Sequence, residues 1–262
     1  SARSMNNQRD RRFTILLTPF MSCGAKVPIY ALFTRAFFAG HQVLVMSAFY
    51  LTGVAVSIIV GLVLKRTAFH GDAAPFIMEL PAYRLPAPRN VARQLWDKAS
   101  DFLKRAFTVI FLATMVVWFL QYFTFTLSPA PDMAHSMLGV IAGAIAPVFA
   151  PAGFGTVEAS TAVLTGVMAK ESVVSTLAVL SGVDAESTQM VASMHAIFPS
   201  TLAAVSFLLF VLLYMPCVAA FATMRREMES GRWAFGTVAA QTALAWVVAT
   251  VVFQAGRLLG LA

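Results

Sequence analysis

Charged side chains are scarce in this sequence of 262 residues: they make up 12% of it, whereas 59% of the residues are hydrophobic. Soluble domains usually carry about 25% charged residues. Several nearly uncharged stretches also exceed the roughly 18 residues that indicate a bilayer-spanning helix. The composition therefore excludes an ordinary soluble protein. Because open strand edges stay unsatisfied in lipid, it predicts an all-α, polytopic membrane bundle.

Motifs of enzymes and of disulfide scaffolds are also missing. The only two cysteines, Cys23 and Cys217, both lie in apolar segments, which argues against a disulfide framework. The sequence has no G-x-x-x-x-G-K-[ST] loop, no H-E-x-x-H pair and no Ser/His/Asp set that its pattern brings together, so we expect neither a nucleotide site nor catalysis. No A-x-A cleavage site follows the basic first residues, so we expect a chain that begins inside a longer protein.

Basic residues outnumber acidic ones and give a net charge of +7. They cluster beside apolar segments, where they set topology and contact anionic lipid, so we expect the bilayer, and not nucleic acid, as a partner. The clusters within 1–12, 65–105 and 225–232 place those loops in the cytoplasm. Residues 128–156 and 181–199 contain no Lys or Arg and are expected outside. The segment between them must then enter and leave by one face, as a re-entrant hairpin or as a short span followed by a long one.

The apolar pattern divides the chain into a cytoplasmic tail (1–12), a broken helix plus a transmembrane helix (13–64), a cytoplasmic loop (65–105) and a transmembrane bundle (106–262). In the loop, the proline-rich residues 80–88 are expected to be extended, and Asn90 is expected to cap an amphipathic helix on the membrane surface. The bundle contains five apolar segments, each expected to be helical: 106–127, 137–150, 157–180, 200–224 and 235–259.

The first candidate site is the break in segment 13–38, which Pro19, Gly24 and Pro28 interrupt. Irregular backbone at membrane depth survives only where it is buried in protein or lines a wet cavity, and there it offers carbonyls and helix ends to an ion. The alternative is a simple proline kink. A charge inside the membrane needs a partner or water, so Lys26 favours the first interpretation, and Met21, Gly24 and Lys26 become candidates for a path or gate.

The second candidate is Met215-Pro216-Cys217. Cys217 is eight residues from Arg225, and Cys23 is eleven from Arg12. At about 1.5 Å per residue, both thiols lie roughly 12 to 16 Å from the cytoplasmic face. Thiolates suit borderline and soft divalent metals, so the sequence predicts a shared metal site of Cys23 and Cys217, with Met215 and Pro216 beside the path. The alternative is that each cysteine packs as a small apolar residue.

The third candidate is Lys170-Glu171, inside segment 157–180. Neighbouring residues of a helix do not face each other, so each is expected to find a separate partner. Ionisable residues at membrane depth suggest function, and the alternative is an interhelical ion pair that holds the bundle together. We expect Glu158 to be structural, near a helix start, and His195 to be a solvated loop residue.

Three stretches resemble motifs of the FeoB family of bacterial ferrous iron transporters. T-P-F-M-S-C-G-A-K-V-P, from Thr18, looks like the motif after the family's first gate region. G-V-M-A-K-E-S-V-V-S, from Gly166, is similar to the second gate motif, and Y-M-P-C-V-A, from Tyr214, resembles the family's Pro-Cys helix. E-L-P-A-Y-R-L-P, at 79–86, is also typical, and the resemblance covers the chain from about Thr14 onwards.

This resemblance implies Fe²⁺ uptake across a bacterial inner membrane through gate-type helices in 106–262. It implies a GTPase domain N-terminal to this chain and small cytoplasmic Feo proteins as partners. The sequence leaves open whether the chain forms a homo-oligomer. Cys23, Cys217 and Glu171 match motif positions that are candidates for the iron path. A nucleoside or other organic-solute carrier of the same gate architecture is the alternative, and a scaffold in which both cysteines merely pack is a third.

Overall fold

A computed structural model describes residues 7–67, 87–105, 107–108 and 111–260. Within these ranges the chain is helical, and the only β-type pairing is an isolated bridge between Phe123 and Pro129. The predicted all-α class is confirmed. The extended stretch expected at 80–88 and the first half of the tail expected at 1–12 lie largely outside the described residues.

Four helical stretches of the described chain are long and apolar enough to cross a bilayer, as expected for a multi-pass membrane protein. Two are continuous helices, α3 (Gln42–Thr67) and α12 (Gly231–Leu258). The other two are broken: one consists of α1 (Gln8–Leu17) and α2 (Val27–Phe37), the other of α10 (Thr201–Leu213) and α11 (Val218–Met228). The broken helix predicted around Gly24 is therefore confirmed.

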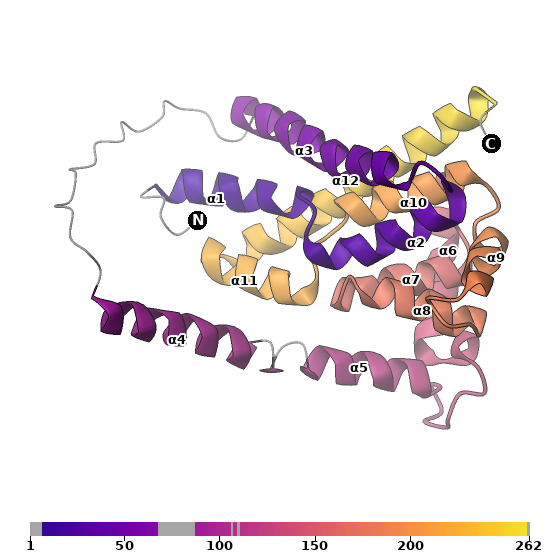
Figure 1. Ribbon diagram of the computed structural model, residues 1–262, viewed down its shortest axis with the longest axis horizontal. Coiled ribbons are helices and arrows are strands. Elements are labelled where there is room, and N and C mark those ends of the chain that lie inside the picture. Colours follow the sequence, from indigo (N-terminus) through magenta and orange to yellow (C-terminus); the bar gives the residue numbers. More distant parts are fainter. Residues whose placement is uncertain (1–6, 68–86, 106, 109–110, 261–262) are drawn as a thin grey trace.

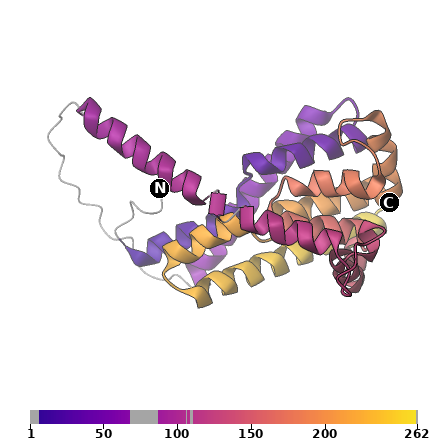
Figure 2. The same ribbon diagram turned by 90° about the horizontal axis from the view of Figure 1, so that it is seen from below.

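The remaining helices are shorter. They are α4 (Pro88–Arg105), α5 (Phe111–Tyr122), α6 (Met137–Phe149), α7 (Val157–Met168), α8 (Ser172–Ser181) and α9 (Thr188–Ile197). Helix α6 turns into α7 through 104°, and α7 and α8 then form a hairpin whose open end lies near α9 (Figure 1). Helix α4 projects away from the bundle (Figure 2).

Four local predictions were wrong. Segment 157–180 is two helices, and the outer loop 181–199 contains α9. In segment 106–127 helix α5 ends at Tyr122, because the chain at Phe123 turns to pair with Pro129. The 12 residues of α5 cover roughly 18 Å at about 1.5 Å per residue. Helix α4 begins at Pro88, where the missing N–H of a proline costs nothing, so Asn90 lies inside the helix.

A large aromatic core holds α2, α9 and α10 together. Helix α10 is buried on nearly all sides, and it packs against α2, α3 and α12. The rings of Phe33 and Phe207 stack with centroids 5.3 Å apart, and Phe198 joins them from the end of α9. Such offset aromatic pairs stabilise beyond their buried area, so this core fixes α2 and α10 relative to each other.

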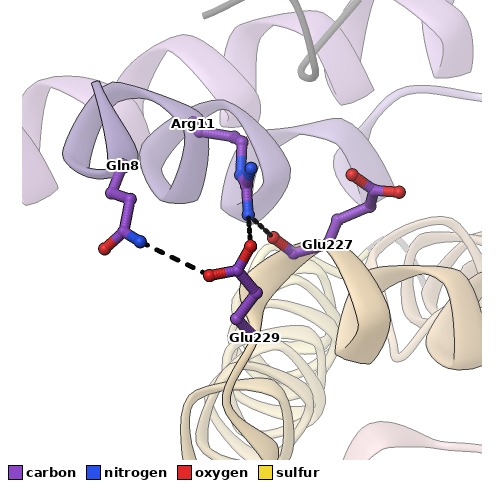
Figure 3. Close-up of polar contacts among 4 residues, drawn as sticks. All are labelled: Gln8, Arg11, Glu227 and Glu229. Atoms are coloured by element: carbon purple, nitrogen blue, oxygen red, sulfur yellow. Dashed lines mark hydrogen bonds and ion pairs between the residues drawn. The ribbon is translucent and has the colours of Figure 1, made fainter. Parts of the chain in front are cut away.

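A second, smaller core joins α1, α11 and the start of α12. Its members are Ile15, Met224, Met228 and Ala234. At its edge, the guanidinium of Arg11 lies 2.8 Å from the Glu229 carboxylate and donates to the Glu227 carbonyl at 2.7 Å (Figure 3). Glu229 ends α11 with φ of +53°, the left-handed conformation that stops a helix. Helices α1 and α11, one half of each broken helix, are thus attached to each other.

Candidate cation-translocation site

Three helix breaks lie near the middle of the molecule's long axis (Figure 1). The first separates α1 from α2, the second separates α7 from α8, and the third separates α10 from α11. Helix α2 packs against both α8 and α10, and α11 packs against α7. The three irregular backbone segments are therefore neighbours in space although they are far apart in the sequence.

Prolines explain the first break. Pro19 is the second residue of a 3-10 turn, Thr18–Phe20, and Pro28 lies in the first turn of α2. Because proline lacks an N–H, neither position can continue the preceding helix, but both suit the start of a new one. Cys23 lies between them in extended backbone, with φ −97° and ψ 163°.

The third break leaves the last carbonyl groups of α10 without partners in a continuing helix. Helix α10 ends at Tyr214, and Pro216 prevents its continuation, so α11 starts anew after the extended Cys217. The Lys26 ammonium, 3% exposed, donates to the Leu212 carbonyl at 2.7 Å. A cation at the C-terminal end of a helix is favoured by the helix dipole, so this contact ties the first break to the third.

The second break contains no proline or glycine. Ala169 leaves the helix in extended backbone, with φ −146° and ψ 124°. This turn brings Lys170, 3% exposed, over the Tyr214 ring, with Nζ 3.1 Å from the centroid. The geometry is that of a cation–π contact. Lys170 Nζ has no hydrogen-bond partner in the described part of the chain.

Gly166 makes room for this arrangement. A Cβ at this position would collide with the Tyr214 hydroxyl and would lie 2.6 Å from Val173 Cγ2. The same hydroxyl donates to the Val163 carbonyl at 3.4 Å. Tyr214 is therefore held between α7 and the third break, directly beneath Lys170.

The structure brings four predicted site residues together. The Cys23 and Cys217 thiols both lie within electrostatic range of Lys26 and of Lys170. Cys23 is exposed and Cys217 is half-buried, so neither is sealed in the core. Of the other candidates, Met21 and Gly24 are exposed, Met215 is half-buried and Pro216 is buried.

Two residues singled out in the sequence differ from their predictions. Lys170 is in no ion pair with the described residues, so the interhelical ion pair, which was the alternative interpretation, is absent there, and Glu171 is exposed beside it. His195 lies in α9 and not in a loop: its Nε2 is 3.1 Å from the Ala36 carbonyl oxygen, and its ring packs on Phe37 with centroids 4.5 Å apart. The role of Glu171 stays a prediction.

The site is poor in ligands for a permanently bound metal. No group of three or more His, Cys, Asp or Glu side chains able to hold a metal occurs in the described ranges. Two thiols and open helix ends can offer only incomplete coordination. Conduction requires binding that is weak enough for the ion to leave again, so this arrangement suits passage better than storage.

Sequence reasoning missed the roles of Tyr214 and Gly166. Tyr214 directly precedes the Met-Pro-Cys motif, and Gly166 lies four residues before Lys170. Each of the two residues lies close in the sequence to polar residues within an apolar segment, and this was the feature that could have pointed to them. Their contact with each other depends on the tertiary structure and leaves no periodic pattern.

Comparisons with known proteins identify the family of the chain. The family model described as ferrous iron transport protein B C terminus matches residues 46–98, and the one described as nucleoside recognition matches residues 103–231. The Fe(2+) transporter FeoB of Staphylococcus aureus (strain COL) is 36% identical over 98% of this chain, and that of Methanocaldococcus jannaschii is 35% identical over 99%.

A fusion of Fe(2+) transport protein A with Fe(2+) transporter FeoB, from Porphyromonas gingivalis, is 30% identical over 98% of the chain. The chain spans 38%, 39% and 36% of the lengths of these three relatives. No solved structure matches it. The motifs around Cys23, Lys170 and Cys217, the two family models and the relatives agree, and the chain belongs to the FeoB family, as a C-terminal membrane part.

Proposed function

We propose that this chain forms the permeation part of a protein that takes up Fe²⁺ across the bacterial inner membrane. The convergence of three helix breaks, with two accessible thiols beside them, is the observation that carries the proposal. Broken helices at membrane depth are a common way to present carbonyls and helix ends to an ion. Sulfur ligands suit a borderline divalent metal.

In the proposed path, Fe²⁺ arrives from outside, passes Glu171 at the tip of the α7–α8 hairpin, and is transferred between Cys23 and Cys217 toward the cytoplasm. Met21, Gly24 and Lys26 form the movable first break, and Lys170, Met215 and Pro216 flank the second and third. The domain limits at 13–64 and 106–262 separate the first broken helix from the gate-type bundle.

The names of the relatives support the substrate and suggest partners. Relatives are named as Fe(2+) transporters, and one is fused to Fe(2+) transport protein A, so a small cytoplasmic Feo protein is a proposed partner. We also propose that a GTPase domain precedes this chain in the full-length protein and supplies the nucleotide site. This chain itself would perform no catalysis, and a homo-oligomer is compatible with it.

Anaerobic uptake of radiolabelled Fe²⁺ by cells that make the full-length protein tests the proposal. Cys23→Ser and Cys217→Ser are each expected to reduce uptake at least severalfold, with normal protein levels in the membrane. Ser47→Ala is the matched control, because this hydroxyl of α3 bonds only within its own helix, to the Val43 carbonyl. Unchanged uptake in the double cysteine variant would refute the ligand role.

A nucleoside or other organic-solute carrier makes the opposite prediction. Labelled nucleoside uptake should then depend on the protein and should not respond to loss of the thiols. The relatives favour iron over this alternative, and a parallel uptake assay with a labelled nucleoside checks the choice directly.

A further inference from the structure

A cavity of about 310 Å³ lies at the open end of the α7–α8 hairpin, which the basic residues of the chain assign to the outside. We call it the outer cavity. It is lined by Thr156, Glu158, Leu180, Ser181, Ser193, Ala196 and Ile197. Four of these residues carry oxygen in their side chains, and the single charged one is acidic. The lining is therefore suited to a cation and not to an anion.

Glu158 has no ion-pair or hydrogen-bond partner among the described residues, although it is half-buried. Its charge is favourable at the start of α7, which is the role predicted from the sequence. Glu158 also lines the cavity, and its role at the helix start does not explain this position. A carboxylate without a counter-ion in a recess attracts cations.

The hydroxyl of Ser181 gives independent evidence for a ligand. Its oxygen is buried and has no hydrogen-bond partner in the described part of the chain. Buried polar atoms nearly always have a partner, so a bound water is expected here. Ser181 also ends α8, and the C-terminal end of a helix carries partial negative charge.

The outer cavity lies at one end of the hairpin whose other end reaches the thiols. Thirteen residues separate Thr156 from Ala169, which at about 1.5 Å per residue is roughly 20 Å. Buried hydroxyls occur along this length: Ser160 Oγ has no partner, and Thr176 Oγ1 donates to Thr165 Oγ1 at 2.9 Å. The hairpin thus carries polar atoms from the cavity to the break at Lys170.

We infer that the outer cavity binds a hydrated divalent cation, with the Glu158 carboxylate as its one charged ligand, before the ion moves toward the thiols. The inference rests on the proposed function and adds a site to it. A single carboxylate with hydroxyls and waters binds a divalent ion loosely, as hard oxygen ligands allow. Such a site raises the local ion concentration without holding the ion back.

Fe²⁺ uptake kinetics test the inference in the full-length protein. Glu158→Gln should raise KM about three- to tenfold and leave the maximal rate within about twofold, because it removes binding and not a later step. Glu158→Asp, which keeps the charge, should lie close to the wild type. Glu186→Gln is the matched control: it removes the same charge from the same outer face, but Glu186 does not line the cavity.

An equal KM increase in Glu158→Gln and Glu186→Gln would show a general surface effect and would overturn the site. An unchanged KM in Glu158→Gln would also overturn the site, and so would a lower maximal rate of Glu158→Gln with the wild-type KM. If Glu158→Gln fails to reach the membrane, Ser181→Ala takes its place and should raise KM by about twofold.

A binding measurement separates this inference from the proposed function. Mn²⁺ prefers oxygen ligands over thiols, and the free ion can be counted by its electron paramagnetic resonance signal. The purified wild type and Glu186→Gln should each bind one more weak Mn²⁺ than Glu158→Gln. Equal binding by all three would overturn the outer site, whereas a wild type that binds Mn²⁺ but transports no Fe²⁺ would overturn the proposed function alone.

Discussion

At the scale of single residues, Lys26 and Lys170 are both buried amines, but their surroundings differ. Lys26 donates to a backbone carbonyl of α10, whereas Lys170 lies on an aromatic ring without a hydrogen-bond partner in the described chain. Desolvating a charge is costly unless hydrogen bonds replace the lost water. The two lysines should therefore contribute differently to stability.

Substitution by methionine, which keeps most of the apolar stem, should reveal this difference. Lys26→Met leaves the Leu212 carbonyl without its donor and should destabilise the protein by about 1–3 kcal/mol. Lys170→Met removes an unsatisfied buried amine and should leave the thermal midpoint in detergent unchanged or higher. A larger loss of stability for Lys170→Met would mean that the ring contact outweighs the desolvation cost.

Gly166 gives a second prediction at this scale. Gly166→Ala should destabilise the protein by about 1–3 kcal/mol, the usual range for overpacking, because its Cβ meets Tyr214 and Val173. Gly236→Ala in α12 is the control, since no atom lies within 4 Å of its added Cβ. Alanine favours helix over glycine by up to about 1 kcal/mol, so the control should be neutral or stabilised. Thermal unfolding measures both variants.

At the scale of elements, the sequence predicted those helices whose limits depend on local chemistry. Long uncharged segments identify α3 and α12, and prolines identify the break beside Cys23. The break at Ala169 could not be predicted in the same way. It contains neither proline nor glycine, and it accompanies the contact of Lys170 with Tyr214, which lies 44 residues further along the sequence.

The attachment of α1 to α11 makes a prediction for these two elements. Glu229→Gln removes the ion pair with Arg11. The side chain of Arg11 is 21% exposed and that of Glu229 is 57% exposed. Exposed pairs contribute about 0–1 kcal/mol, so the thermal midpoint should hardly change. Amide hydrogen exchange in 8–17 and 218–228 should nevertheless become faster, because ends of helices open locally. Asp132→Asn, at a distant exposed loop, should leave exchange in both helices unaltered.

At the scale of the whole molecule, two separate cores divide the bundle. The large core contains α2 and α10, and the small core contains α1 and α11. Each broken helix therefore has one half in each core, and the cysteines lie at the two connections between them. The sequence predicted the gathering of the thiols from their similar depth, but it could not predict the two cores, because they arise from contacts between distant segments.

This division predicts how the molecule responds to a cross-link. Cysteines introduced at Ile15 and Met224, both in the small core, would join α1 to α11 and should leave Fe²⁺ uptake nearly unchanged if the two helices move together. Cysteines at Leu17 and Gly61 would join α1 to α3, where Leu17 already approaches Gly61, and should block uptake. Loss of uptake in the first pair alone would mean that α1 and α11 separate during transport.

Among the described helices, α12 is the one long helix that belongs to both cores: Ala234 lies in the small one, and Ala245 and Ala249 lie in the large one. An unbroken helix resists changes of length, since stretching it would break the backbone hydrogen bonds between successive turns. Spin labels at its two ends should therefore keep one separation throughout a transport cycle. The distance between a label on α1 and a label on α2 should take two values. Helix α12 can therefore serve as a fixed reference when the movement of its neighbours is measured.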